Sequence, residues 1–176
     1  MSSNQPILIA GGGPVGLVAA YALGQQGIPV IVFDDNDELQ LDPRAATTHP
    51  ASFRNGWVLL AGDSCHVNNS IGGMGLNGGI QDAMNLTGKL TRVIKGEARD
   101  SVLDLYDLQR RTFATDFVQE QTIQNKKRLE ARDSAQRKNN LDELRATAAD
   151  PARARQFLLK SSMITDMRRV AEMRLD

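Results

Sequence analysis

The chain has 176 residues, of which 41% are hydrophobic and 24% charged, so it is long enough for one domain with a hydrophobic core. Its 21 basic residues balance its 21 acidic residues, and the lack of a basic surplus argues against nucleic-acid binding. The single cysteine excludes an internal disulfide. The sequence contains no run of 18 apolar residues that would predict a membrane span, and we expect a cytoplasmic protein.

The first third of the chain alternates apolar runs with a helical segment. Three continuous apolar runs predict strands, over residues 5–10, 29–33 and 57–61. Runs of this kind are typical of strands that are buried on both faces of a parallel sheet. Residues 14–26 predict a helix, because Pro14 suits a first turn and Gly27 suits a C-terminal stop.

The remainder of the chain predicts helices. Apolar residues at helical spacing predict an amphipathic helix over 79–95. A long helix is expected over 102–132, with Phe113 and Phe117 on one side as core residues rather than cofactor contacts. Further helices are expected over 140–149, 152–160 and 162–174.

The segment between the second and third strand candidates, residues 35–57, shows no helical period. Parallel neighbours need a crossover of a dozen or more residues, which is usually a helix. Three short strands also make a small sheet for six helices. We therefore expect an α/β fold with an incomplete parallel sheet, followed by a helical C-terminal region.

A G-x-G-x-x-G pattern lies at Gly11, Gly13 and Gly16, with Pro14 and Val15 between the last two glycines. The pattern follows a strand candidate and opens a helix. The first glycine permits the tight turn, the second lets the backbone approach a pyrophosphate, and the third lets the helix pack close to the strand. The helix N-terminus adds free N–H groups for the phosphates. The pattern predicts a dinucleotide site.

Asp34 strengthens this prediction, because it ends the next strand about 20 residues on, where a partner for a ribose hydroxyl is expected. Asp35 is the rival for this role, and Asp34 is favoured because it follows Phe33 directly. These residues do not choose between NAD and FAD.

A second motif begins at Gly62-Asp63, after the third strand candidate. It continues into a glycine-rich loop that contains Gly75, Leu76 and Asn77. This pair of motifs in this order resembles the group A flavoprotein monooxygenases, the para-hydroxybenzoate hydroxylase-like family. The resemblance implies a Rossmann-like FAD-binding domain.

The resemblance also implies roles for individual residues. Asp63 would accept a hydrogen bond from the flavin ribitol, and the loop at residues 72–77 would lie along the isoalloxazine edge. The helix that starts near Gly79 would direct its N-terminal dipole at the ring. Arg44, in the segment 42–50, stands where the family has an arginine that contacts the FAD phosphate and ribose region.

The chain departs from the family after His49-Pro50. In the family a domain's worth of sequence separates this element from the Gly-Asp motif, and it supplies the substrate-binding sheet. We therefore expect an internal deletion near residues 50/51, an FAD-binding domain over 1–96 and a helical C-terminal region over 97–176.

By resemblance, the intact enzymes use NADH or NADPH to reduce FAD, and the reduced flavin uses O2 to hydroxylate a small phenolic substrate. In this chain we expect hydroxylation to be absent or weak, and the sequence assigns no catalytic residue. No metal site is expected, because no His, Cys and acidic residues stand at metal-ligand spacing, and Cys65 is expected to be a buried thiol. The alternatives are a non-catalytic, helix-rich fragment that acts through self-association, as a homo-oligomer, or through partner binding, and an NAD-binding reductase.

Overall fold

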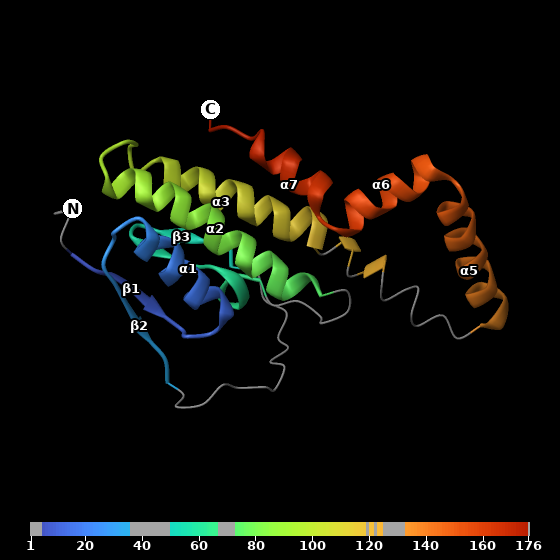
Figure 1. Cartoon of the computed structure of the whole chain (residues 1–176), viewed down its shortest axis with the longest axis horizontal. Coiled ribbons are helices and arrows are strands. Elements are labelled where there is room, and N and C mark those ends of the chain that lie inside the picture. Colours follow the sequence, from blue (N-terminus) through green and yellow to red (C-terminus); the bar gives the residue numbers. More distant parts are fainter. Residues whose placement is uncertain are drawn as a thin grey trace.

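The protein is a mixed α/β, helix-rich chain with a small parallel sheet at one end (Figure 1). The computed structural model describes residues 5–35, 50–66, 73–118, 120–121, 123–124 and 133–175. In chain order the elements are β1 (Ile7–Ala10), α1 (Pro14–Gln25), β2 (Val30–Phe33), β3 (Arg54–Asn55), β4 (Val58–Leu59), the 3-10 turn η1 (Gly62–Ser64), α2 (Met74–Ile94), α3 (Val102–Thr112), the π-helical turn η2 (Phe113–Val118), α5 (Ser134–Ala149), α6 (Pro151–Ser161) and α7 (Ile164–Ala171).

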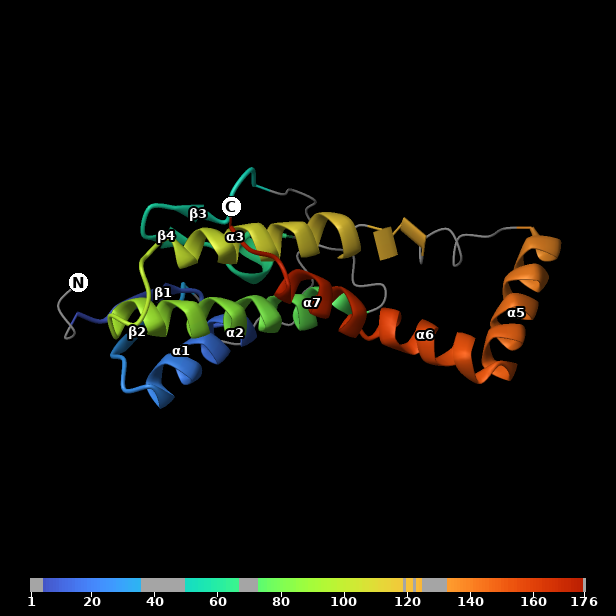
Figure 2. The ribbon, with the colours of Figure 1, turned by 90° about the horizontal axis from the view of Figure 1, so that it is seen from above.

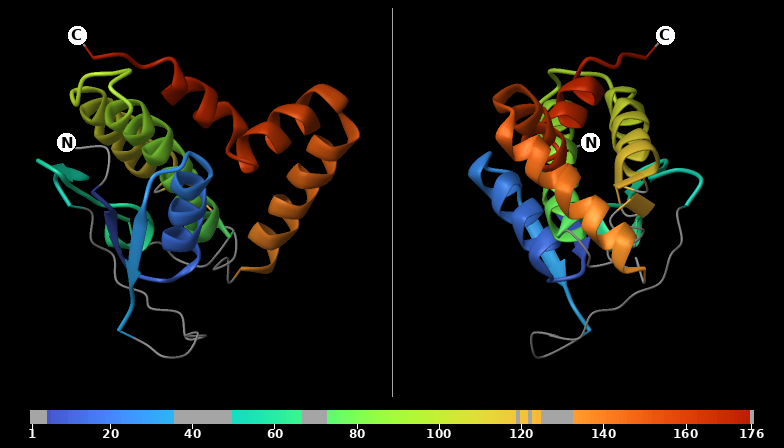
Figure 3. Two further views of the ribbon diagram at one scale, coloured as in Figure 1. Left: turned by 60° about the vertical axis from the view of Figure 1, so that its left-hand side comes forward. Right: turned by 90° about the vertical axis from the view of Figure 1, so that its right-hand side faces the viewer.

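Strands β1 and β2 pair in parallel, with Ile7 opposite Val30. Helix α1 makes the crossover between them and packs against both the strands and α2 (Figures 1 and 3). This agrees with the expected strand–helix–strand order. The expectation of burial on both faces is wrong, because Leu8 is 63% exposed and Ile31 44% exposed. Only one face is covered by helices among the described residues, so the apolar side chains of the other face remain on the surface.

The third apolar run does not extend the parallel sheet within the described part of the chain. Its residues Val58–Leu59 form β4, which pairs antiparallel with β3. A two-residue turn joins the strands, and Gly56 takes a φ of +60° there. Such a turn places the partners side by side at little cost in loop closure, so local pairing prevails over pairing with a distant strand.

Helices α2 and α3 lie side by side along the molecule, whereas α5 lies at the end remote from the sheet (Figure 2). Helix α2 begins at Met74, five residues before the expected start. The long helix expected over 102–132 changes type in its middle, because α3 ends at Thr112 and a π-helical turn follows it directly. This turn buries four apolar side chains together, namely Phe113, Ala114, Phe117 and Val118. Part of the expected helix, residues 125–132, lies outside the described residues.

Two apolar clusters form the core. The first joins the inner face of the sheet to α1, α2 and α3, and includes Leu23, Phe53 and Leu90. The second joins η2 to α7 and includes Phe113 and Phe117, which confirms that these two rings are core residues. None of the residues of α5 is buried. Within the described ranges, every helix is too short or too polar to cross a membrane.

Candidate functional site

The first glycine motif forms a tight junction between β1 and α1. Gly11 takes a φ of +110°, and its N–H donates to the carbonyl oxygen of Phe33 at 2.7 Å. A Cβ added at Gly16 would lie 1.9 Å from the carbonyl oxygen of Gly11. No side chain fits there, so a glycine at this position is what lets α1 begin directly against the turn.

The outer side of this junction is open. A Cβ added at Gly11 or at Gly13 would meet no atom within 4 Å. Gly13 is the N-cap of α1, no side chain caps the helix, and its first turn contains no acidic residue. The first-turn N–H groups of a helix lack intrahelical acceptors and carry the positive end of the dipole. This surface can therefore receive an anionic group close to the backbone.

Asp34 lies at the edge of the same junction. Its carboxylate accepts a hydrogen bond from the N–H of Gly12 at 2.5 Å. The acidic group that the sequence assigns to a ribose is thus held beside the glycine turn.

The second motif contacts the first through Val15. A Cβ at Gly62 would lie 2.9 Å from Cγ2 of Val15, and a Cβ at Gly79 would lie 2.6 Å from the same atom. It would also lie 3.1 Å from Cα of Gly62. Val15 of the first motif therefore sits between two glycines of the second motif and its following helix. The packing requires both to lack a side chain.

Asp63 follows Gly62 in the turn η1, and its side chain is exposed. The hydroxyl of Ser64 ties the turn together, because it accepts from the N–H of Ala61 and donates to the carbonyl oxygen of the same residue. The hydroxyl of Tyr106 on α3 donates to the carbonyl oxygen of Leu60, just before the turn.

Three further predicted residues, Gly75, Leu76 and Asn77, lie in the first turn of α2 rather than in a loop. Gly73 is the N-cap, with a φ of +65°, and its carbonyl oxygen accepts from the side-chain amide of Asn77 at 2.8 Å. Leu76 is exposed. Arg44 lies outside the described residues.

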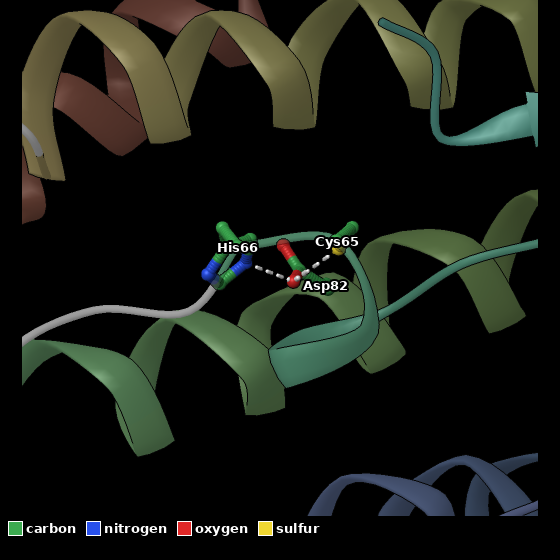
Figure 4. A group of neighbouring side chains, drawn as sticks. All are labelled: Cys65, His66 and Asp82. Atoms are coloured by element: carbon green, nitrogen blue, oxygen red, sulfur yellow. Dashed lines mark hydrogen bonds and ion pairs between the residues drawn. The ribbon is translucent and has the colours of Figure 1, made fainter. Parts of the chain in front are cut away.

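Beneath the second motif is a fully buried charged network that the sequence analysis missed. The carboxylate of Asp82, on α2, accepts from the N–H of Gly62 at 2.9 Å and contacts Nε2 of His66 at 2.5 Å (Figure 4). Its other oxygen accepts from Nε of Arg110 at 2.5 Å. Burial alone would raise the pKa of Asp82, but the hydrogen bond with His66 and the charge of Arg110 outweigh it, so the pKa lies below its ordinary value.

Arg110 carries the network into the helical region. Its guanidinium donates to the carbonyl oxygen of Gly78 at 3.2 Å and to the sulfur of Met167 at 3.1 Å. It also lies 4.3 Å from the ring centroid of Phe113. The sequence does contain a signal for this network. Asp82 and Arg110 are charged residues among the apolar positions of two successive predicted helices, and charges at core positions have to pair.

Cys65, His66 and Asp82 also bring three potential metal-ligand atoms within 4.8 Å of one another, a proximity that sequence spacing did not predict (Figure 4). Burial, and then the negative charge of Asp82, raise the pKa of the Cys65 thiol. A cysteine binds a metal as the thiolate, which the raised pKa of Cys65 disfavours. Arg110 also already supplies the positive charge next to Asp82. The donor set therefore suits a hydrogen-bond network better than a metal centre. Cys65 is buried, as expected.

Comparison with known proteins agrees with these features. The sequence model of the FAD binding domain family matches residues 4–54 and 50–121. The chain belongs to this family. Its two matched segments carry the first and the second glycine motif, respectively.

Among curated proteins, the para-nitrophenol 4-monooxygenase of Pseudomonas sp. (strain WBC-3) is 38% identical over 125 residues, which cover 71% of this chain and 31% of that protein. The tetracenomycin B2 monooxygenase-dioxygenase of Streptomyces olivaceus is 40% identical over 114 residues, or 64% of this chain and 20% of that protein. The crystal structure of p-nitrophenol 4-monooxygenase from Pseudomonas putida superposes with a TM-score of 0.59 at 37% identity, over 63% of this chain and 29% of that one. The chain therefore spans less than a third of the length of these relatives.

Proposed function

We propose that this chain binds FAD between its two glycine motifs, as the cofactor-binding part of an NAD(P)H-dependent aromatic hydroxylase. The observation that carries the proposal is the position of Val15 between Gly62 and Gly79, because it joins two motifs that are distant in the sequence. FAD has two ends, a dinucleotide end and a flavin end, and one motif for each suits a ligand of this length. The open glycine surfaces fit a group that has to approach the backbone closely.

We infer that β1, α1 and β2 form the start of a Rossmann-like sheet within an FAD-binding domain over residues 1–96, followed by a helical region over 97–176. The parallel register, the glycine turn and the acidic residue after β2 support this assignment. The ion pair of Asp82 with Arg110 then crosses the proposed boundary, so the helical region supports the domain that binds the cofactor.

In this proposal the backbone at Gly11, Gly13 and Gly16, with the N-terminus of α1, holds the pyrophosphate. Asp34 and Asp63 accept hydrogen bonds from sugar-type hydroxyl groups, Asp34 on the ribose and Asp63 on the ribitol. Arg44 contributes a positive charge to the phosphate region.

The N-terminal turn of α2, with Gly75, Leu76 and Asn77, lies at the flavin ring in the same proposal. Its uncapped N–H groups favour negative charge on the ring system. When bound, FAD supplies the redox chemistry, in which NAD(P)H is the reductant and O2 the oxidant.

The substrate class is proposed from the relatives, which include a para-nitrophenol 4-monooxygenase and a 3-(3-hydroxy-phenyl)propionate/3-hydroxycinnamic acid hydroxylase. A small phenolic compound is the corresponding substrate here. The family match is in two segments that meet at residues 50–54, which supports an internal deletion near 50/51. Because the chain spans less than a third of the length of these relatives, we expect little or no hydroxylation by the chain alone.

The proposal is tested by titrating the purified chain with FAD and following the quenching of flavin fluorescence. Asp63→Ala is expected to weaken FAD binding about ten- to a hundredfold, since a hydrogen bond to a charged group contributes about 1.5–3 kcal/mol and 1.4 kcal/mol is tenfold. Asp142→Ala is the matched control, because Asp142 is an exposed acidic residue on α5, remote from the motifs. Equal FAD affinity in the two variants, or no uptake by the unchanged chain, contradicts the proposal.

A second candidate function, self-association, is favoured by the uncovered face of the sheet. Leu8, Ile31 and Phe33 are exposed there and are neighbours on the strand pair. Contiguous exposed apolar side chains of this kind mark interaction surfaces. Sedimentation of the chain and of Ile31→Lys tests this function: a dimer that becomes a monomer in the variant supports it, and a monomer in both cases excludes it.

A further inference from the structure

The proposed function assigns no role to the hydrogen-bond network of Asp82, His66 and Arg110 under the Gly-Asp motif. We infer that Asp82 is a positioning residue, which holds the Gly62-Asp63 peptide in the orientation that the flavin site requires. The expected effect on FAD binding rests on the proposed function, whereas the hold of Asp82 on the turn follows from the geometry of the network.

One oxygen of Asp82 closes both ends of a short segment. Oδ2 accepts from the N–H of Gly62 at 2.9 Å and contacts Nε2 of His66 at 2.5 Å. Within the segment, the N–H groups of Cys65 and His66 both donate to the carbonyl oxygen of Gly62, at 2.9 and 3.0 Å. The five residues from Gly62 to His66 therefore form one closed turn around a single carboxylate oxygen, and Asp63 and Ser64 are the exposed residues on it.

The second oxygen of Asp82 is fixed from α3. Nε of Arg110 donates to Oδ1 at 2.5 Å, and the same guanidinium donates to the carbonyl oxygen of Gly78, one turn earlier on α2. Both side chains of the ion pair are fully buried, with 0% exposure. Arg110 thus fixes the direction in which the carboxylate points, so that Oδ2 faces Gly62.

His66 depends on the same group. Its ring is buried, and its Nδ1 has no hydrogen-bond partner among the described residues. The contact with Asp82 is thus the polar contact that orients the ring there. The ring in turn lies next to Gly78, where a Cβ would be 3.4 Å from Cε1 of His66. Loss of Asp82 would free both ends of the turn at once.

The position of Gly62 matters because Val15 packs against it. A shift of Gly62 changes the distance from Asp63 to the N-terminus of α1, and hence the fit of one ligand that contacts both. A buried ion pair contributes little to stability compared with apolar residues of the same volume, so stability alone is a weak reason for a fully buried Asp–Arg pair here. Orientation of a hydrogen-bonding turn is a role that an apolar pair could not fill.

The test compares Asp82→Asn with a control of reduced stability. Leu103→Ala is the control, because Leu103 is fully buried on α3 in the first apolar cluster and makes no polar contact with Asp82. Two quantities are measured without denaturant, at a temperature at which each variant is folded. They are the rate of amide hydrogen exchange, followed by mass spectrometry, and the Kd for FAD. Peptides over residues 62–66 are compared with peptides over α1 in the same sample.

For Asp82→Asn we expect exchange over 62–66 to accelerate at least tenfold more than exchange over α1, and the Kd for FAD to rise about tenfold or more. For Leu103→Ala we expect the ratio of the two exchange rates, and the Kd, to stay within about threefold of those of the unchanged chain. Equal ratios in the two variants overturn the inference, as does a Kd that is the same in both. If Asp82→Asn does not fold, Arg110→Lys decides instead, because it keeps the charge but loses the planar fork that orients Asp82.

The two proposals fail in different ways. If the unchanged chain takes up no FAD, the proposed function is wrong, and the exchange ratio still decides whether Asp82 positions the turn. If the unchanged chain binds FAD and the ratio does not change in Asp82→Asn, the proposed function stands and the positioning role is refuted.

Discussion

Replacement of Gly16 by alanine is the sharpest test of how α1 is joined to the sheet. The added Cβ would lie 1.9 Å from the carbonyl oxygen of Gly11, a backbone atom, and 3.3 Å from Cγ2 of Ile9. An ordinary contact needs at least 3.4 Å, so the start of α1 has to move away by about 1.5 Å. Overpacking of this kind costs about 1–3 kcal/mol, and a clash with backbone belongs at the upper end of that range.

The matched control is Gly24→Ala, in the same helix. A Cβ there meets no atom within 4 Å, so this variant changes helix propensity without a clash. We expect Gly24→Ala to raise the free energy of unfolding by up to about 1 kcal/mol. Gly16→Ala is expected to lower the free energy of unfolding by about 2 kcal/mol, because the clash costs about 3 kcal/mol and the gain in helix propensity offsets about 1 kcal/mol of it.

Urea unfolding followed by far-UV circular dichroism measures both values. The two variants are expected to differ by about 3 kcal/mol, with Gly16→Ala the less stable. A midpoint for Gly16→Ala at or above that of Gly24→Ala would show that α1 is not packed against the Gly11 carbonyl, and would refute the close junction on which the dinucleotide site depends.

Three further predictions concern α2. Gly88→Ala should raise the free energy of unfolding by about 1 kcal/mol in urea titrations, because the position is exposed, within the helix, and open to a Cβ; a loss of stability would refute the helix at this point. Burial, followed by the charge of Arg110, lowers the pKa of Lys89 to about 8, so its acylation rate, followed by mass spectrometry, should have its midpoint near pH 8 instead of near the ordinary 10.5; a midpoint near 10.5 contradicts this. The pKa of Asp82 is lower in the folded chain than its ordinary 3.8, so the ionised carboxylate should contribute fully to stability above pH 3.8 and less as the pH falls below it. Urea midpoints of Asp82→Asn, measured from pH 6 downward, should therefore fall less steeply than those of the unchanged chain. Parallel curves would argue against an ionised carboxylate at this position.

The first three elements could be predicted from the sequence because their ends are set locally. Gly11 to Gly13 close β1, and Pro14 starts α1 at the expected residue. Asp34 follows β2 directly, as expected for the residue that ends the strand. Each of these positions depends on the conformational preference of one residue type, so a single sequence contains the information.

The start of α2 could not be predicted in this way. Glycines at 75, 78 and 79 disfavour a helix by intrinsic propensity, and the apolar periodicity that predicts the helix begins only at Ile80. The structure is helical there because Gly79 allows contact with Val15 and Gly62, and such packing outweighs propensity.

The Asp82–Arg110 pair was missed for a related reason. The two residues are 28 positions apart, on different helices. Charges at core positions indicate that each needs a partner, but the packing is what shows that these two meet. Pairing of β4 with β3 instead of β1 was likewise decided by a turn at Gly56 rather than by the apolar content of the strand.

Amide hydrogen exchange of the chain with and without saturating FAD shows whether one FAD molecule contacts both glycine motifs. Peptides over residues 11–16 and over 62–66 are expected to be protected together, at one FAD per chain, while α5 is unaffected. Protection of the first motif alone would indicate a dinucleotide site without a flavin site, and protection of neither would show that FAD does not bind at these motifs.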